Sequence, residues 1–212
     1  MNTDDFIALL ATGVTPVAHN LPEKRFRRAL ALSVPVALAI LLGLGVRPDL
    51  LDVLGNPMLW AKLAFPGAVA VISLLWVLRL SRPGMPTGRL PTSLALPVLG
   101  MGLLAAVALT QAAPADRTAL VLGTTWRVCT LNIALVAVPV FVGGFWAVKG
   151  LAPTRLVLTG AVVGLMAGAA GAVVYALHCP EMEAPFLLVW NSLGMLLPTV
   201  AGAALGPRLL KW

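Results

Sequence analysis

Residues 177–186, with the sequence LHCPEMEAPF, place reactive and ionisable side chains between two long apolar stretches. The imidazole of His178 precedes the thiol of Cys179, and the carboxylates of Glu181 and Glu183 follow it. A thiol beside such groups can undergo reversible oxidation or bind a soft metal ion. The chain has one further cysteine, Cys129. Whether the two thiols act together depends on the elements that carry them.

The composition indicates that these elements cross a membrane. Of the 212 residues, 59% are hydrophobic and only 11% are charged, too few polar residues to cover a water-soluble domain of this size. A bilayer core requires roughly 20 apolar residues per helix. Six stretches reach this length, at approximately 29–46, 60–80, 91–110, 128–148, 156–177 and 186–205. The sequence therefore predicts an all-α fold, a six-helix transmembrane bundle with short loops.

Basic residues are divided unequally between the two sides of the predicted bundle. Of the 15 Lys and Arg residues, only Arg47, Lys62, Arg117 and Arg127 fall on the side away from the N-terminus. Cytoplasmic loops carry the excess of basic residues, so we expect both termini to be cytoplasmic in a bacterial inner membrane. The net charge of +7 then belongs mainly to a girdle facing anionic lipid, and we expect no direct contact with nucleic acid.

This topology places both cysteines at the outer boundary of the membrane. The loop between the last two spans faces outward, and Cys129 begins the fourth span from the same side. The spans themselves contain few ionisable groups: Lys62 is close enough to the outer end of its span for its ammonium to extend to the interface. This scarcity argues against transport by a charged-residue mechanism, and a small-molecule transporter or channel is the alternative function. No room remains for a soluble catalytic domain, so we do not expect an enzyme.

The fifth predicted span carries a row of small residues. Gly160, Gly164 and Gly168 recur at every fourth position, a spacing that puts them on one face of a helix and allows another helix to approach closely. Two interpretations are open. The ridge packs against another helix of the same bundle, or it forms the contact between two copies of the chain in an oligomer.

Residues 1–28 form a separate N-terminal segment in this interpretation, ahead of the transmembrane domain at 29–212. The segment is predicted to contain a short helix capped by Thr3, with the sequence TDDFIALLA, followed by a turn and a basic anchor. An apolar stripe on so short a helix must be covered by the membrane surface, by the protein's own bundle or by a groove on a partner. The stripe consists of Phe6, Ile7, Leu9 and Leu10.

Three features together resemble the NrsF-type membrane-bound anti-sigma factors of proteobacteria. They are the N-terminal TDDFIALLATGVTPV, the six spans, and LHCPEMEAPFLLVWNSLGM after a glycine-rich fifth span. The resemblance covers essentially the whole chain. It implies an inner-membrane protein that binds an extracytoplasmic-function sigma factor through its cytoplasmic N-terminal segment. By position, the residues that contact the sigma factor would be Phe6, Ile7, Leu9 and Leu10.

The resemblance also implies that an outward-facing cysteine pair, Cys129 and Cys179, senses an oxidant, an electrophile or a heavy metal. The residues themselves leave three alternatives open for this pair. The thiols form a reversible disulfide, which an oxidising envelope permits; they hold a soft metal ion together with His178; or they are inert buried groups. No other cofactor is expected. Glu181 and Glu183 are alternative ligands in the second of these interpretations, and the favoured expectation for His178, Glu181 and Glu183 is that they make the turn polar.

Overall fold

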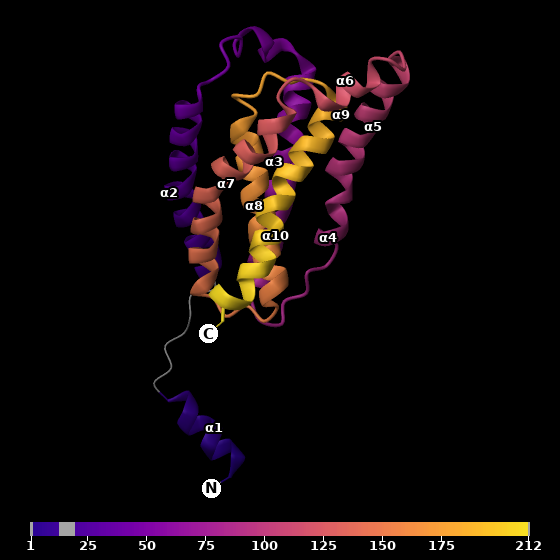
Figure 1. Ribbon diagram of the computed structural model, residues 1–212. Coiled ribbons are helices and arrows are strands. Elements are labelled where there is room, and N and C mark those ends of the chain that lie inside the picture. Colours follow the sequence, from indigo (N-terminus) through magenta and orange to yellow (C-terminus); the bar gives the residue numbers. More distant parts are fainter. Residues whose placement is uncertain (1, 13–19, 212) are drawn as a thin grey trace.

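The computed structural model describes residues 2–12 and 20–211, and within these residues the secondary structure is entirely helical (Figure 1). Among these described residues, six helices or runs of consecutive helices are long and apolar enough to cross a membrane, which agrees with the number of spans predicted from the sequence. They are α2 (Leu21–Leu44), α3 (Pro57–Leu80), α4 with α5 (Leu90–Ser93 and Ala95–Gln111), α7 (Trp126–Lys149), α8 (Leu156–Tyr175), and α9 with α10 (Ala184–Phe186 and Ser192–Leu209). Shorter elements are α1 (Thr3–Ala11), a 3-10 turn (Asp52–Gly55), α6 (Arg117–Leu122) and a π-helical turn (Leu187–Asn191).

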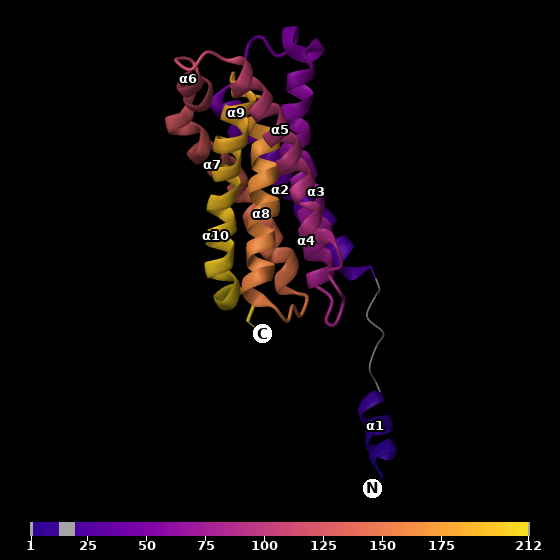
Figure 2. The ribbon, with the colours of Figure 1, turned by 90° about the vertical axis from the view of Figure 1, so that its right-hand side faces the viewer.

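The bundle has two chemically different ends. The start of α2, the α3–α4 and α7–α8 connections and the C-terminus lie together at what we call the basic end (Figures 1 and 2). The α2–α3 connection, α6 and the α8–α9 loop lie together at the opposite, cysteine end (Figure 1). The unequal division of basic residues in the sequence is therefore also a division in space. Which end faces the cytoplasm stays a prediction.

Helix α8 is at the centre of the bundle, where it packs against α3, α7 and most extensively α10. Its glycine ridge makes the last contact possible. A Cβ atom at Gly164 would lie 2.0 Å from the carbonyl oxygen of Pro198, and one at Gly160 would lie 2.1 Å from that of Gly202. Backbones at this separation leave no space for a side chain. The ridge, including Gly168, is thus covered by α10 of the same chain, as the first of the two interpretations expects.

Helix α2 begins at Leu21, eight residues before the predicted span. Pro22 occupies the first turn, where its fixed φ favours the helix and its missing N–H is not needed. The basic segment that follows is part of this helix. It also packs against the rest of the bundle, since Phe26 and Ala29 are buried in the core. Residues 21–28, which the sequence analysis assigned to the N-terminal segment, are thus part of the first long helix.

Helix α1 is capped one residue earlier than the sequence suggested. The Asn2 side chain accepts a hydrogen bond from the backbone N–H of Thr3 at 2.8 Å, and the Asp5 carboxylate accepts one from the Asn2 N–H at 3.3 Å. None of the residues of α1 is buried, and the helix lies apart from the bundle, beyond the basic end (Figures 1 and 2). The predicted turn at Gly13–Pro16 lies outside the described residues.

Candidate functional site

The structure brings Cys129 and Cys179 together at the cysteine end. Cys129 is in the first turn of α7, and Cys179 is in the loop after α8, where its N–H donates to the Tyr175 carbonyl at 3.0 Å. Both side chains are almost fully buried in one hydrophobic cluster, and both are free thiols. The fold therefore brings two residues that are fifty positions apart in the sequence into the same cluster.

Lys62 of α3 is buried beside this pair. Its side chain is 1% exposed, and its ammonium donates to the carbonyl oxygens of Cys179 at 2.6 Å and Glu181 at 2.8 Å. The expectation that Lys62 extends to the interface is wrong, because the α8–α9 loop folds over the end of α3 and supplies two acceptors inside the protein.

Arg47, in the connection between α2 and α3, binds the same loop from another side. Its backbone N–H donates to the Leu177 carbonyl at 3.1 Å, and its Nη1 donates to the Cys179 carbonyl at 3.4 Å. Its guanidinium also makes a two-pronged pair with Asp49, at 2.8 and 2.7 Å, which lowers the pKa of that carboxyl. The Cys179 carbonyl thus receives hydrogen bonds from two cationic side chains.

Glu181 connects the loop to the start of α7. Its Oε1 accepts hydrogen bonds from the backbone N–H groups of Thr124 and Thr125, at 2.7 and 3.1 Å, and from both hydroxyls. Burial opposes ionisation of this carboxyl, but the four hydrogen bonds outweigh it and lower the pKa of Glu181. A carboxylate at a helix N-terminus stabilises the helix. Glu181 is therefore a tertiary cap for the helix that carries Cys129, a role beyond the polar turn that the sequence suggested.

Two features fix the junction in which Glu181 lies. Gly123 has a φ of +57°, and a Cβ atom there would lie 2.6 Å from the Phe186 ring and 2.8 Å from Oε2 of Glu181, so only glycine fits. Trp190, in the π-helical turn, donates from its indole nitrogen to the Val121 carbonyl at 2.8 Å and packs against Trp126 with ring centroids 5.5 Å apart. The start of α7, the loop and the start of α10 consequently form one unit.

His178 is directed elsewhere. Its Nδ1 lies 2.5 Å from the carbonyl oxygen of Gly45, and since a carbonyl can only accept, Nδ1 is the donor. Its ring lies 5.3 Å from that of Tyr175. Among the described residues no three His, Cys, Asp or Glu side chains form a group that could hold a metal ion. The structure therefore does not bring His178 into a ligand set with the two cysteines.

The electrostatic surroundings favour reactivity of Cys179. The hydrogen bond with Cys129 lowers the pKa of the Cys179 thiol, burial opposes this, and the positive charge of Lys62 lowers the pKa further. A thiol whose pKa is lowered has more of the nucleophilic thiolate at neutral pH.

At the basic end, the first turns of α2 are fastened to the helices that reach the cysteine end. Arg25 donates from Nε to the Ala147 carbonyl at 2.9 Å and from Nη2 to the Trp146 carbonyl at 3.0 Å, which are in the last turn of α7. Glu23 pairs with Arg82, just after α3, at 2.5 Å. The start of α2 is therefore held by the ends of α7 and α3 that lie at the basic end.

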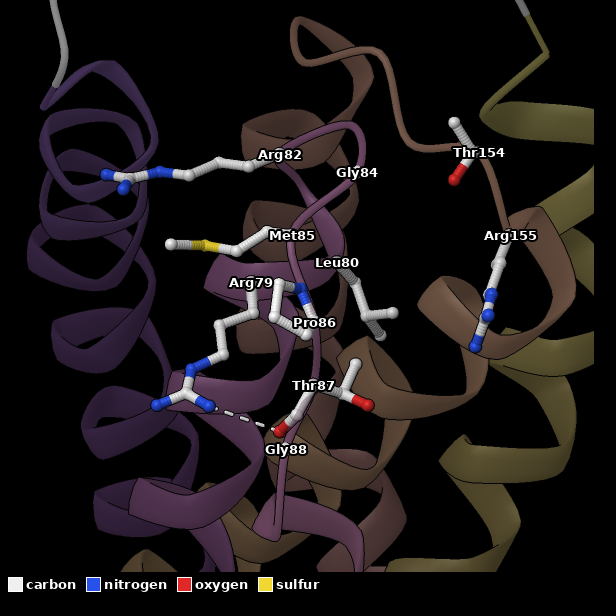
Figure 3. Close-up of a pocket in the computed structure, with 10 residues that line it drawn as sticks. All are labelled: Arg79, Leu80, Arg82, Gly84, Met85, Pro86, Thr87, Gly88, Thr154 and Arg155. Carbon is white, nitrogen blue, oxygen red and sulfur yellow. Dashed lines mark hydrogen bonds between the residues drawn. The ribbon is translucent and has the colours of Figure 1, made fainter.

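A cavity of about 390 Å³ also opens at the basic end, between the α3–α4 connection and the start of α8 (Figure 3). Arg155 and Thr154 line one side of it. Arg79 donates to the Thr87 carbonyl at 3.2 Å, and Arg82 extends toward α2 (Figure 3). The arginines of this cavity do not converge on one point, so it does not have the geometry of a substrate site.

Comparison with known proteins identifies the family. A family model described as "Negative regulator of sigma F", NrsF, matches residues 10–212. The chain belongs to the NrsF family. It is 47% identical to the probable anti-sigma-F factor NrsF of Azospira oryzae and 37% identical to the anti-sigma-F factor NrsF of Caulobacter vibrioides, each over the full length of both chains. No solved structure matches it.

Membership of the NrsF family confirms the resemblance found in the sequence, and the names of both relatives describe regulators rather than enzymes. Sequence reasoning missed the part played by Lys62, Arg47 and Glu181 in this NrsF-family chain. Lys62 did provide a signal, because a lone charge in an apolar span is costly and is expected to have a specific partner. The partners of Glu181 could not be inferred, since they depend on how α6 and α7 are joined.

Proposed function

We propose that this chain is a membrane-bound anti-sigma factor that binds an extracytoplasmic-function sigma factor through α1. The observation that carries the proposal is the apolar stripe on this helix. Its side chains are 46% to 63% exposed and none is covered by the bundle: Phe6, Ile7, Leu9 and Leu10. This exposure supports a contact outside the protein's own bundle, and the relatives' names as anti-sigma-F factors favour a protein partner over the membrane surface.

In this proposal the basic end faces the cytoplasm and the cysteine end faces outward. Eleven of the 15 Lys and Arg residues are at the basic end, the distribution expected of cytoplasmic loops. Helix α1 and the C-terminus are then on the side where a sigma factor is found. The girdle of basic residues faces anionic lipid headgroups.

The stimulus acts at the cysteine end in this mechanism, as an oxidant, an electrophile or a soft metal ion that changes the state of Cys129 and Cys179. Helix α7 extends from Cys129 to the carbonyls that hold Arg25. A change in how the start of α7 is held can therefore reach the first turns of α2, and through them α1. To reverse a 1:99 equilibrium between two arrangements of the bundle, the change at the cysteines must favour one arrangement over the other by roughly 5.5 kcal/mol.

The decisive experiment measures binding of the full chain, in lipid nanodiscs, to the sigma factor encoded beside its gene. A variant lacking residues 2–12 is expected to lose binding, and a sigma-dependent reporter in cells carrying it should be constantly active. Binding that survives the deletion would refute the role of α1. Solute flux in proteoliposomes, together with no effect of the deletion on the reporter, would establish the transporter alternative.

The cysteines are tested separately with Cys129→Ser and Cys179→Ser. Both variants should bind the sigma factor like the unmodified chain, because α1 is unchanged. Both should fail to release it when cells are exposed to oxidant or to cadmium, and the reporter should stay at its basal level. A normal response in either variant would remove that cysteine from the mechanism.

A further inference from the structure

Lys62 is a cation in an apolar span whose described partners are backbone carbonyls alone. No carboxylate of the described residues lies within ion-pair distance of its ammonium. A buried charge is retained at a cost in stability, and an apolar side chain of similar volume is often no less stabilising. The presence of Lys62 at this position is therefore better explained by what it holds than by its contribution to the stability of the fold.

What Lys62 holds is the segment that carries Cys179. Its two acceptors are the carbonyls of Cys179 and Glu181, two residues apart on the α8–α9 loop. Arg47 reaches the first of them at the longer distance of 3.4 Å, and Glu181 ties the same loop to the start of α7 through Thr124 and Thr125. Lys62 thus attaches this loop to α3, whereas Glu181 attaches it to the start of α7.

We propose that Lys62 is the positioning residue of the cysteine pair. Its two hydrogen bonds keep the Cys179 loop against the first turn of α7, so that the two sulfurs stay close enough to be joined. The proposal rests on the sensing role proposed above for Cys129 and Cys179. In it, Lys62 is the group that allows the two thiols to form one disulfide.

Diamide, a two-electron thiol oxidant, joins such a pair in two steps. One sulfur adds to a nitrogen of the N=N bond, and the neighbouring nitrogen takes up the proton. The second sulfur then attacks the first, the S–N bond breaks, and the hydrazine leaves with the second proton. The two thiols lose two electrons in forming the S–S bond, and the N=N bond gains them. The second step requires the two sulfurs to be close together, which is the part played by Lys62.

The test is the reduction potential of the pair in the purified full chain, measured in glutathione buffers by thiol alkylation and a gel shift. In Lys62→Met the loop keeps its Glu181 contacts with the start of α7 but loses its attachment to α3, so the two sulfurs are held together less firmly in the dithiol state, which disfavours the disulfide. We expect the disulfide equilibrium constant to fall by about tenfold or more, which makes the potential less negative by about 30 mV or more. Lys62→Arg, which can donate to both carbonyls, should restore most of the difference.

Lys149→Met is the matched control, because Lys149 is the exposed last residue of α7 at the basic end. Its potential should equal that of the unmodified chain. Where Lys62→Met does not accumulate, Lys62→Gln serves instead: its shorter side chain cannot reach both carbonyls, and the potential should change in the same direction.

An unchanged potential in a folded Lys62→Met or Lys62→Gln variant would overturn the proposal. So would an equal change in Lys149→Met, or a pair that diamide does not join in the unmodified chain. Sigma-factor binding by the same preparations is a separate measurement. Its loss in all preparations would refute the anti-sigma function, whereas intact binding with an unchanged potential refutes only the role of Lys62.

Discussion

The strongest quantitative consequence of the structure concerns Leu9 and Leu10 of α1. Their side chains are 63% and 61% exposed, so about three fifths of each is available to be covered by a partner. Burying a whole leucine side chain is worth roughly 1.5–3 kcal/mol. Covering the exposed part on the sigma factor should therefore contribute about 1–2 kcal/mol per leucine, and Leu9→Ala or Leu10→Ala should weaken binding by roughly 5- to 30-fold.

The assay is the dissociation constant of the full chain in nanodiscs for the sigma factor, measured by biolayer interferometry. Alanine has the highest helix propensity, so loss of binding would reflect lost contact rather than an unfolded α1. Leu103→Ala on α5 is the control: this leucine is 67% exposed, and its helix belongs to the bundle. It should leave the dissociation constant unchanged. If both α1 variants bind within twofold of the unmodified chain, the apolar stripe is not the contact surface.

Two further predictions concern the bundle. Gly164→Ala should lower the free energy of unfolding by about 1–3 kcal/mol in detergent denaturation, because its Cβ atom would lie 2.0 Å from the Pro198 carbonyl oxygen. Gly102→Ala is the control and should not lower it, because no atom lies within 4 Å of the added Cβ atom. Equal effects of the two substitutions would contradict the close contact of α8 with α10. Glu181→Gln should lower thermal stability at pH 7, since the carboxylate has a lowered pKa and its contribution is fully present above the ordinary value of 4.5. As the pH falls through the lowered pKa this contribution is lost, so the difference between the two proteins should shrink below pH 4.5, and a difference that persists there would refute the capping role.

Much of the architecture was predictable because a bilayer imposes simple rules on a sequence. The lengths of the apolar stretches determined six spans, and the basic residues determined which loops share an end. The apolar stripe of α1 was visible in nine residues, since helical periodicity depends only on local spacing. The spacing of Gly160, Gly164 and Gly168 indicated a close helix contact, but the same spacing suits a contact within the chain and a contact between chains.

Only the tertiary structure decided that the ridge is covered by α10 and that Lys62 is buried. Both outcomes depend on which helices are neighbours, and spans of similar hydropathy do not specify their neighbours. The same holds for Glu181, whose partners Thr124 and Thr125 precede it by more than fifty residues. The sequence by itself determined that two thiols lie near one end of a six-helix bundle. The packing of three helices and one loop decided that they meet, because contact between distant residues is set by the shape of the whole bundle and not by any local pattern.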